Sequence, residues 1–262
     1  MLRVGVVGAA GRMGSLVCLA VEADPDLELV AAVDPAGRGA SAAAGRLEVS
    51  PDRSSLKVAG AEVVVDFSHI GAAMDSLEFC AGAGIHVVMG TSGFDPDRVA
   101  RARELFPSGA GRPNCIIVAN FALSAVLAVR FAELAAPWFE TAEVIELHHN
   151  AKIDAPSGTA ISTAERMGRA RGDSPWAAEP TTDEVLPGAR GGLHDSGIHI
   201  HSVRMSGMVA HEEIILGTTG QTLTIRQDSY DRQSYMPGVL MAVKAVPGLE
   251  GVTVGLERVL GI

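Results

Sequence analysis

The segment of this 262-residue chain with the clearest chemical potential runs from Glu146 to Ala160 and reads ELHHNAKIDAPSGTA. It contains two adjacent histidines, and the pKa of imidazole lies close enough to neutral pH for a histidine to donate a proton. Neighbouring residues on an extended backbone point to opposite faces. We therefore expect one of His148 and His149 to face a ligand as a proton donor, and we do not expect both to bind one metal ion. A pair of structural histidines is the alternative that the spacing leaves open.

The second half of this segment has the composition of an anion-binding site. Ser157 or Thr159 can cap a helix that begins here, and Gly158 allows close approach to the backbone. Free amide groups in the first turn of a helix attract anions, by up to about 2 kcal/mol in partly buried geometry. Lys152 adds a mobile positive charge in a chain with only 3 lysines. The segment therefore predicts a site for a carboxylate or a phosphate.

A glycine-rich turn near the N-terminus predicts a second site. The apolar run Leu2–Val7 is followed by GAAGRMG, with glycines at positions 8, 11 and 14. Such a turn between a strand and a helix lets backbone amides approach a pyrophosphate. Asp34 lies twenty residues further on, at the end of the second predicted strand, where a carboxylate can bind ribose hydroxyls. The pattern predicts a dinucleotide site, and a turn chosen only for packing is the alternative.

The sequence gives conflicting indications of which dinucleotide binds. Asp34 favours NADH because its charge repels a 2′-phosphate, whereas Arg12 and Arg38 lie where a cation could accommodate that phosphate. We therefore expect NADH and/or NADPH. The loops Gly90–Gly93 and Ala119–Phe121 follow the fourth and fifth predicted strands. Both are candidates to contact the nicotinamide half, because the carboxyl ends of parallel strands line the ligand crevice.

Up to about residue 120, short β-branched runs alternate with helical segments. The predicted strands are Leu2–Val7, Leu27–Val33, Glu62–Phe67, Ile85–Met89 and Asn114–Ala119, and the predicted helices are Met13–Ala23, Ala72–Gly82 and Pro96–Phe106. This alternation is typical of a Rossmann-type α/β domain, a doubly wound parallel sheet covered on both faces. The segment from Gly37 to Ala59 is rich in Ala, Gly and Ser and predicts a mobile connection with one short element at most.

After Phe121 the rhythm changes. We expect helices at Phe121–Ala135 and Gly158–Arg171, a loop over 172–197, and strands at Ala142–Leu147, Gly197–Arg204, Glu212–Gly217 and Thr222–Gln227. Strands that follow one another predict an α+β domain with an open mixed sheet. A helix at Val239–Val246 and a strand at Val252–Gly255 could return to either domain. We assign residues 1–121 with about 232–262 to a dinucleotide-binding domain and 122–231 to a substrate-binding and oligomerisation domain.

Composition narrows the class of protein. A net charge of −10 and only 11 aromatic residues argue against binding to nucleic acids or to anionic membranes. Cys18, Cys80 and Cys115 fit neither a metal motif nor a disulfide framework, so we expect buried thiols. His199 and His201 share one face of a strand but lack a suitably spaced partner, and no metal is expected. The N-terminus reads as a strand rather than a signal peptide, and no apolar run could span a bilayer, so we expect a cytoplasmic protein.

Together these motifs resemble those of the 4-hydroxy-tetrahydrodipicolinate reductase (dihydrodipicolinate reductase) family, which acts in the diaminopimelate route to lysine. The run ELHHxxKxDAPSGTA is the most specific of them. The resemblance extends over nearly the whole chain, through Gly8–Gly14, Asp66–Ser68, Gly90–Gly93, Asn120–Phe121 and Arg226–Asp228. It implies the NAD(P)H-dependent reduction of 4-hydroxy-tetrahydrodipicolinate, a small dicarboxylate, to tetrahydrodipicolinate by a homotetramer.

The resemblance also implies a role for individual residues. His148 corresponds to the general acid, and Lys152 to the lysine that assists protonation and binds substrate. The positions implied to bind the substrate carboxylates are His149, Lys152, Ser157, Gly158 and Thr159. The positions implied to contact the cofactor are Gly8, Ala9, Ala10, Gly11, Arg12, Met13, Asp34, Gly90, Thr91, Ser92, Val118, Ala119, Asn120 and Phe121.

Two departures from the family pattern bear on the cofactor. Val118-Ala119-Asn120 stands where the family often has Ala-Pro-Asn, and Pro35 follows Asp34 where many members have arginine. The second departure argues against a strict preference for NADPH. Another amino-acid-pathway dehydrogenase, of aspartate or homoserine type, and a non-catalytic NAD-binding sensor are the alternative functions.

Overall fold

The computed structural model describes residues 1–37, 39–42 and 45–262. The chain divides into two compact units. The first unit comprises Met1–Phe121 and Arg232–Ile262, and the second comprises Ala122–Asp231. The last helix and strand of the chain therefore return to the unit that contains the N-terminus.

The first unit is built on a sheet of six parallel strands in the order β13–β7–β6–β5–β1–β2. The strands are β1 (Leu2–Val7), β2 (Leu27–Val33), β5 (Val63–Asp66), β6 (His86–Met89), β7 (Cys115–Ile117) and β13 (Val252–Val254). All four residues of β5 are buried, as the continuous β-branched run requires for a strand with both faces covered. The predicted doubly wound parallel sheet is confirmed.

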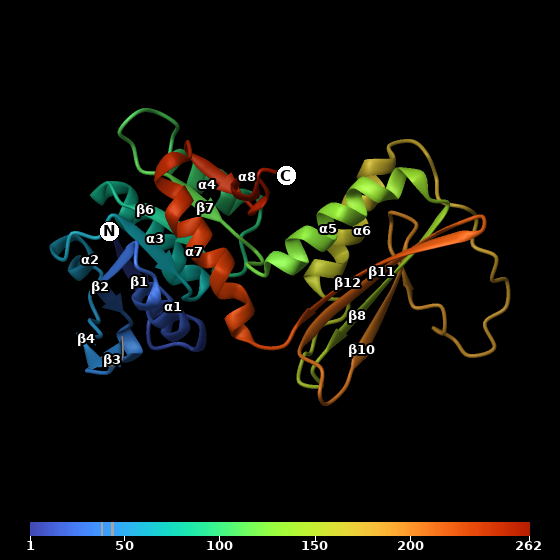
Figure 1. Cartoon of the computed structure of the whole chain (residues 1–262), viewed down its shortest axis with the longest axis horizontal. Coiled ribbons are helices and arrows are strands. Elements are labelled where there is room, and N and C mark those ends of the chain that lie inside the picture. Colours follow the sequence, from blue (N-terminus) through green and yellow to red (C-terminus); the bar gives the residue numbers. More distant parts are fainter. Residues whose placement is uncertain (38, 43–44) are drawn as a thin grey trace. The chain divides into compact units, whose positions relative to one another are not determined.

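Helices form a layer on each face of this sheet. They are α1 (Arg12–Ala23), α3 (Ile70–Ala83), α4 (Pro96–Leu105), α7 (Met236–Ala245) and the short α8 (Glu257–Leu260). α1 contacts α7, and α3 contacts α4 (Figure 1). Asp95 is the N-cap of α4, and its carboxylate accepts from the Arg98 amide. Pro96 follows as the first residue of the helix. These layers hold the carboxyl ends of the strands in place.

The segment after β2 is more ordered than the sequence indicates. Short strands β3 (Ser41–Ala42) and β4 (Leu47–Glu48) pair antiparallel, and helix α2 (Ser54–Val58) follows. The prediction of at most one short element was therefore wrong. The many small residues of this segment obscured two apolar side chains, those of Val49 and Leu56, which are buried in the structure. Residues 38, 43 and 44 lie outside the description.

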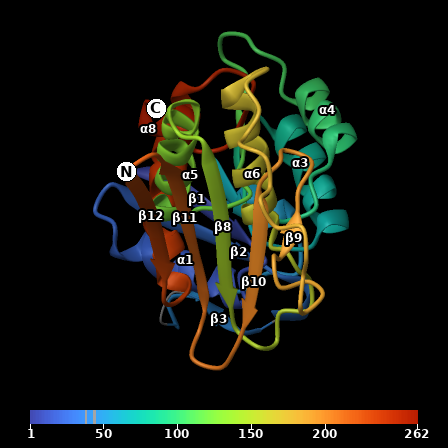
Figure 2. The same ribbon diagram turned by 90° about the vertical axis from the view of Figure 1, so that its right-hand side faces the viewer.

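The second unit packs two helices on a five-stranded mixed sheet in the order β12–β11–β8–β10–β9 (Figure 2). Its elements are α5 (Leu123–Ala135), β8 (Thr141–His148), α6 (Gly158–Arg171), β9 (Gly192–Leu193), β10 (His199–Arg204), β11 (Ala210–Thr218) and β12 (Gln221–Ser229). β8 and β10 are parallel and the other pairs antiparallel. The predicted open mixed sheet is confirmed, and β9 lies within the predicted loop.

The core of the second unit determines which side chains of β8 face the helices. Val144 packs with Ala164 and Met167 of α6. Because side chains alternate along a strand, Glu146 and His148 share the side of Val144. Single-turn 3₁₀ helices complete the chain at η1 (Pro35–Gly37), η3 (Ala136–Trp138), η4 (Arg232–Tyr235) and η5 (Val246–Gly248). Among the helices of the described residues, none is long and apolar enough to cross a membrane.

Candidate functional site

His148 lies at the end of β8 beside a buried ion pair. Its Nδ1 is 2.5 Å from Oε2 of Glu146, whose side chain is fully buried. Arg204 is the partner of His148 in the register of β10 with β8. It donates from both terminal nitrogens to the two oxygens of Glu146, at 2.7 Å each. Because Glu146 occupies Nδ1, Nε2 is the nitrogen of His148 that could bind a ligand.

The charges of this group follow from burial and hydrogen bonding. Burial raises the pKa of Glu146, but hydrogen bonds from Arg204 and His148 outweigh it and bring this pKa down to about 2. Burial lowers the pKa of His148, and the positive charges of Lys152 and Arg204 lower it further against the pull of Glu146. At neutral pH the group therefore holds an ionised Glu146 and an imidazole that gives up its proton readily.

Ser157 and Gly158 form the start of α6 next to Glu146. The Ser157 hydroxyl accepts from the Ala160 amide at 3.2 Å, so Ser157 rather than Thr159 caps the helix. The Ser157 amide donates to Oε1 of Glu146 at 3.2 Å. A Cβ added to Gly158 would meet no atom within 4 Å. The first turn of α6 therefore presents its amides to open space, as an anion seat requires.

Lys152 lies in the loop between β8 and α6. Its Nζ contacts both carboxylate oxygens of Asp154, at 2.8 and 2.7 Å. The Lys152 side chain is only 19% exposed, whereas that of Asp154 is 60% exposed. The lysine therefore holds a displaceable carboxylate in this structure. His149 is exposed, and its carbonyl accepts from the Lys152 amide.

Neither Glu146 nor Arg204 was predicted from the sequence as a functional residue. The local signal for Glu146 was an acidic residue two positions before His148 in a strand, and therefore on the same face. Arg204 ends a predicted alternating strand. Nothing local relates Arg204 to Glu146, because the pair depends on the register of two strands 58 residues apart.

The glycine-rich turn of the first unit fits a dinucleotide. Gly8 has a φ of +76°, and a Cβ on Gly14 would lie 2.0 Å from the Gly8 carbonyl oxygen. α1 therefore starts tightly against the turn, and its N-cap, Gly11, brings no side chain to its free amides. Asp34 lies beside the turn, where one oxygen accepts from the Ala10 amide at 3.1 Å and the other from Ala36. The amides can thus receive a pyrophosphate with a carboxylate nearby.

The remaining residues of the turn are placed as follows. Ala9 is buried, and its amide donates to Val33 at 3.2 Å. Arg12 is exposed and Met13 is half-buried. Arg38, a candidate partner for a 2′-phosphate, lies outside the described residues.

A cavity of about 280 Å³ adjoins the turn. It is lined by the ends of β1 and β2 and by the start of α3, with Pro35, Arg53 and His69 among its residues. Nδ1 of His69 accepts from the Ala72 amide as the cap of α3. The cavity gives room for a ligand next to Asp34, and neither Arg53 nor His69 was predicted from the sequence as a lining residue.

The two loops predicted to contact nicotinamide lie at the same edge of the parallel sheet. Gly90, Thr91 and Ser92 follow β6, and residues 118–121 follow β7. Oδ1 of the buried Asp66 accepts from the Thr91 hydroxyl at 3.1 Å and from the Ser68 amide at 2.8 Å. Asp66 thus joins the loop after β5 to the loop after β6.

The loop after β7, residues 118–121, is buried at its first and last residues. Val118 and Phe121 are buried, Ala119 is exposed and Asn120 half-buried. The rings of Phe67 and Phe121 lie 5.5 Å apart, which connects this loop to the loop after β5. The structure therefore brings the sequence-predicted cofactor residues that it describes to one edge of the sheet.

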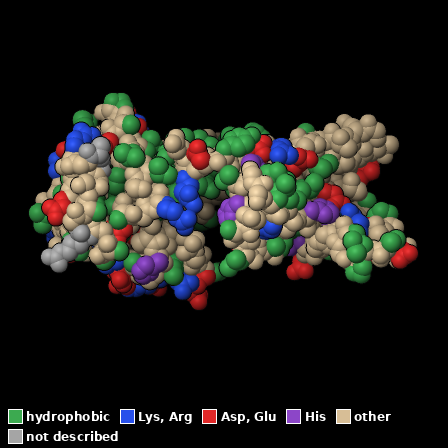
Figure 3. Space-filling model, turned by 90° about the horizontal axis from the view of Figure 1, so that it is seen from below, with side chains coloured by type: hydrophobic (Ala, Val, Ile, Leu, Met, Phe, Trp, Pro, Cys, Tyr) green, Lys and Arg blue, Asp and Glu red, His purple; other side chains and the backbone are tan. Residues whose placement is uncertain are grey.

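The further candidates for a site are the cysteines, the possible metal ligands and the surface charges. Cys18, Cys80 and Cys115 are free and buried, as expected, and burial raises the pKa of the first two thiols to about 12. Within the described ranges, no three His, Cys, Asp or Glu side chains are grouped to hold a metal ion. On the face in Figure 3, Lys and Arg side chains occur in small groups with Asp and Glu among them.

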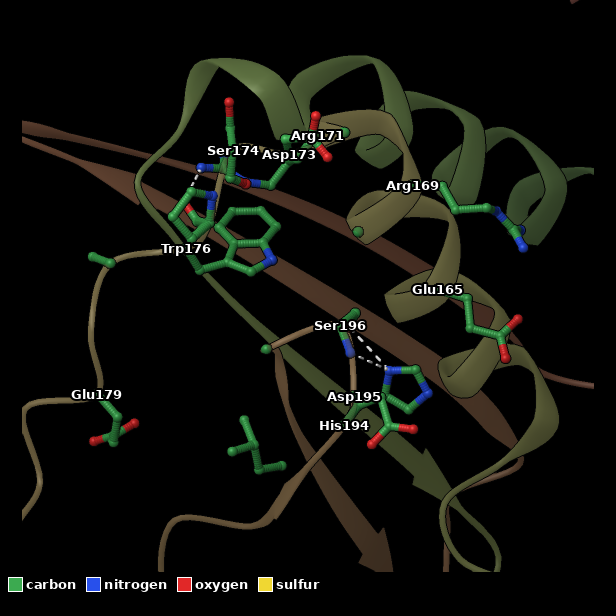
Figure 4. A pocket seen from close by; sticks show the side chains of 16 residues that line it. Glu165, Arg169, Arg171, Asp173, Ser174, Trp176, Glu179, His194, Asp195 and Ser196 are labelled. Atoms are coloured by element: carbon green, nitrogen blue, oxygen red, sulfur yellow. Dashed lines mark hydrogen bonds between the residues drawn. The ribbon is translucent and has the colours of Figure 1, made fainter.

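A second cavity, of about 830 Å³, lies at the C-terminal end of α6 (Figure 4). Arg171 stacks over the ring of Trp176 at 4.0 Å, and His194 bonds to Ser196. α6 has 14 residues, so this cavity is roughly 20 Å from the helix start. None of the sequence-predicted site residues lines it.

A parallel sheet with a glycine-rich turn after its first strand, in a chain that also has a histidine near the free amides of a helix start, is typical of a nicotinamide-dependent oxidoreductase. Residues 2–121 match the family described as dihydrodipicolinate reductase, N-terminus, and residues 123–260 match its C-terminus. The chain belongs to the dihydrodipicolinate reductase family, as its motifs indicated.

Comparison with individual proteins supports the same family. A 4-hydroxy-tetrahydrodipicolinate reductase of Corynebacterium efficiens is 51% identical over 100% of this chain and 99% of the relative. One from Thermobifida fusca is 50% identical over the full length of both. The solved structure of a dipicolinate-bound dihydrodipicolinate reductase from Paenisporosarcina sp. TG-14 superposes with a TM-score of 0.88 at 35% identity, covering 98% of this chain and 99% of the other.

Proposed function

We propose that this chain catalyses the NAD(P)H-dependent reduction of 4-hydroxy-tetrahydrodipicolinate to tetrahydrodipicolinate in the diaminopimelate route to lysine. The observation that carries the assignment is the buried Glu146, which binds both His148 and the start of α6. It places a proton donor and an anion seat next to each other. The dipicolinate bound to a relative supports a ring with two carboxylates as the ligand.

The residues around α6 would hold the substrate. The amides of Gly158 and Thr159 would donate to one carboxylate at the capped helix start, where the helix dipole favours negative charge. Lys152 exchanges Asp154 for a substrate carboxylate, and His149 and Ser157 complete the seat. A fixed partner for each carboxylate, the helix amides for one and Lys152 for the other, would orient the ring before reaction.

The cofactor would be held by the first unit and supplies a hydride when bound. The amides of Gly8–Met13 receive the pyrophosphate, and Asp34 receives the ribose. The loops Gly90–Ser92 and Val118–Phe121 contact the nicotinamide half. Asp66 holds the first of these loops by its bond to Thr91.

His148 would act as the general acid. A bound dicarboxylate brings negative charge close to the imidazole of His148 and raises its pKa, so the ring is protonated in the complex. The 4-hydroxyl of the substrate would leave as water together with a hydrogen of the adjacent ring carbon, and the carbon that loses the hydroxyl would accept the hydride. Nε2 would then give its proton to the adjacent carbon. Glu146 holds Nδ1 and stabilises the charged ring until the proton leaves.

The direct test is an assay with freshly made 4-hydroxy-tetrahydrodipicolinate, followed by the absorbance of the reduced cofactor. We expect turnover with saturation in both substrates. A protein that binds the cofactor without turning over any such dicarboxylate would instead be a non-catalytic sensor.

Lys152→Ala should weaken dipicolinate binding by about 10- to 100-fold, because it removes a charge-assisted hydrogen bond to a carboxylate. Cofactor affinity should change by less than about twofold, since Lys152 lies in the second unit. Calorimetry with the cofactor bound measures the first effect. Lys244→Ala is the matched control, because Lys244 also pairs with carboxylates, those of Asp24 and Asp26. Equal losses for both variants would contradict the role of Lys152.

Both NADH and NADPH should serve, with less than about a thirtyfold difference in kcat/KM. Asp34 can accept from the ribose hydroxyls of NADH and opposes a 2′-phosphate, whereas Arg12 is exposed and can approach that phosphate. Exposed charges contribute about 1 kcal/mol or less each, and a thirtyfold preference needs about 2 kcal/mol. Steady-state kinetics at low salt with each cofactor measures the ratio. Strict use of NADPH would mean that Asp34 does not meet the ribose.

We also propose a cytoplasmic homotetramer. α5 and α6 cover one face of the sheet in the second unit, which leaves its other face and its edges for a second copy. Three free thiols suit a reducing compartment. Light scattering should give about four times the 27.1 kDa chain mass, and a stable monomer at micromolar concentration would contradict the assembly.

A further inference from the structure

Glu212 is a second buried carboxyl group beside the substrate seat. It lies on β11 directly opposite Glu146 on β8, and it is only 4% exposed. Arg204 binds both oxygens of Glu146. The neighbour of Glu212 on β12 is Gln227, which is uncharged. Of these two adjacent carboxyl groups, Glu146 is therefore the one that pairs with Arg204.

The hydrogen bonds of Glu212 decide which of its forms fits. Oε1 of Glu212 is 2.6 Å from the hydroxyl oxygen of Thr163, and that hydroxyl is 2.9 Å from the carbonyl oxygen of Thr159. A hydroxyl has one proton, and a carbonyl only accepts. If Thr163 donates to Thr159, the contact with Glu212 needs a proton from Glu212. If Glu212 is neutral, it donates to the Thr163 hydroxyl, which in turn donates to the Thr159 carbonyl. If Glu212 is ionised, the Thr163 hydroxyl donates to Glu212 instead, and the Thr159 carbonyl loses this hydrogen bond.

The charges around Glu212 also favour the neutral form. Burial, with the negative charge of Glu146 adding to it, raises the pKa of Glu212 to about 7 against the opposing hydrogen bond of Thr163. His148 and Arg204 are gathered around Glu146. On the helices that cover this face, Arg130 and Arg166 both pair with Glu133. The charge that acts on Glu212 is the negative one of Glu146.

We propose that Glu212 is a positioning residue of the substrate seat. As a neutral acid it donates to Thr163 and lets the Thr163 hydroxyl hold the carbonyl of Thr159 in the first turn of α6. On ionisation it withdraws that hydroxyl and adds a negative charge beneath a seat that must receive a dianion. Dicarboxylate affinity therefore falls as the pH rises through neutrality, while cofactor affinity does not. This inference rests on the function proposed for the same seat.

The test compares the dissociation constant of dipicolinate for the wild type and for Glu212→Gln, with the cofactor bound, between about pH 5.5 and 9. Glutamine keeps a donor for Thr163 but cannot ionise. Because other groups titrate equally in both proteins, the ratio of the two constants isolates Glu212. The ratio should be near one at low pH and rise by about tenfold above neutrality, the size expected for one added charge in a partly buried site. A ratio that does not change with pH would overturn the proposal.

Two further variants separate positioning from general packing. Glu213→Gln alters the next residue, which pairs with Arg226, and it should keep the wild-type pH profile. Thr163→Val should weaken dipicolinate binding at low pH, and Thr163→Ser should restore it. A Glu213→Gln profile that follows Glu212→Gln, or a failure of serine to restore binding, would count against the assigned contacts.

A ligand-free measurement keeps the proposal independent of folding in the variants and of the proposed activity. Infrared spectra of the wild type with labelled glutamate should contain the carbonyl stretch of one neutral carboxyl group at pH 6 that is lost near neutrality. Its presence without turnover would refute the reductase assignment alone. The absence of any neutral glutamate at pH 6 would refute the assignment of Glu212.

Discussion

Replacing His148 with glutamine should lower kcat by about 100- to 10,000-fold, the usual contribution of a positioned general acid. Glutamine can still bond to Glu146, which also keeps its bonds to Arg204 and Ser157, so no buried charge is left unpaired. The protein should therefore fold normally, and the affinity for dipicolinate should change only modestly. Steady-state kinetics and a thermal unfolding curve measure the two effects separately.

His149→Gln is the natural control for this experiment, because the neighbouring histidine is exposed and has a proposed role in binding alone. It should raise KM and leave kcat within about threefold. A His148→Gln enzyme that keeps more than about a tenth of the wild-type kcat would exclude His148 as the acid.

Replacing Arg204 with methionine should cost about 3–5 kcal/mol of unfolding free energy at pH 7, the usual penalty for removing one partner of a buried ion pair. The variant leaves the fully buried Glu146 without its main donor. It should also reduce kcat, since Glu146 orients His148. Urea unfolding monitored by fluorescence measures the stability change. Arg226→Met is the matched control, because its side chain is 44% exposed and such surface pairs contribute about 1 kcal/mol or less.

The same variant has a characteristic pH dependence. The pKa of Glu146 falls from 4.5 to about 2 on folding, so its contribution to stability is present above pH 4.5 and is lost as the pH falls towards 2. Without Arg204, burial favours the protonated acid instead. The difference in the free energy of unfolding between the wild type and Arg204→Met should therefore decrease as the pH is lowered. Adding Glu146→Gln should recover part of the loss at pH 7, and a gap below about 1 kcal/mol at pH 7 would contradict the buried-pair account.

Local sequence patterns were sufficient for most of the helices and strands and for the local geometry of the helix start and the glycine-rich turn. Continuous apolar runs such as Val63–Val65 predict a parallel sheet because strands covered on both faces need no polar side. The helix start at Gly158 follows from Ser157 as a cap, and the structure begins α6 there. The turn after β1 also depends on adjacent residues, since Gly8 and Gly14 meet within one loop. These features are encoded within about fifteen residues.

The parts that sequence did not predict depend on pairing between distant segments. Arg204 reaches Glu146 because β10 pairs with β8 in one particular register, and a shift of one residue would turn the arginine to the other face. Glu212 meets Thr163 through the register of β11 and the packing of α6. The elements between β2 and β5 escaped detection for another reason, because single anchors such as Leu56 have no periodicity.

One carboxylate joins the proton donor to the start of α6, and this has a mechanical consequence. Oε2 of Glu146 holds His148 while Oε1 holds the Ser157 amide, so both ends of the loop 149–156 are fastened to a single rigid, planar group. The separation between acid and anion seat is therefore set by the width of a carboxylate and not by the eight residues that connect them. Within the loop, the backbone of Asp154 is held as well, because its carbonyl accepts from Arg204 at 2.7 Å, so only the side chains of Lys152 and Asp154 would need to move to admit a ligand. Residues 146–160 thus combine two charged side chains with a backbone that is fixed at both ends, so a ligand could displace the side chains without changing the position of the imidazole relative to the start of α6.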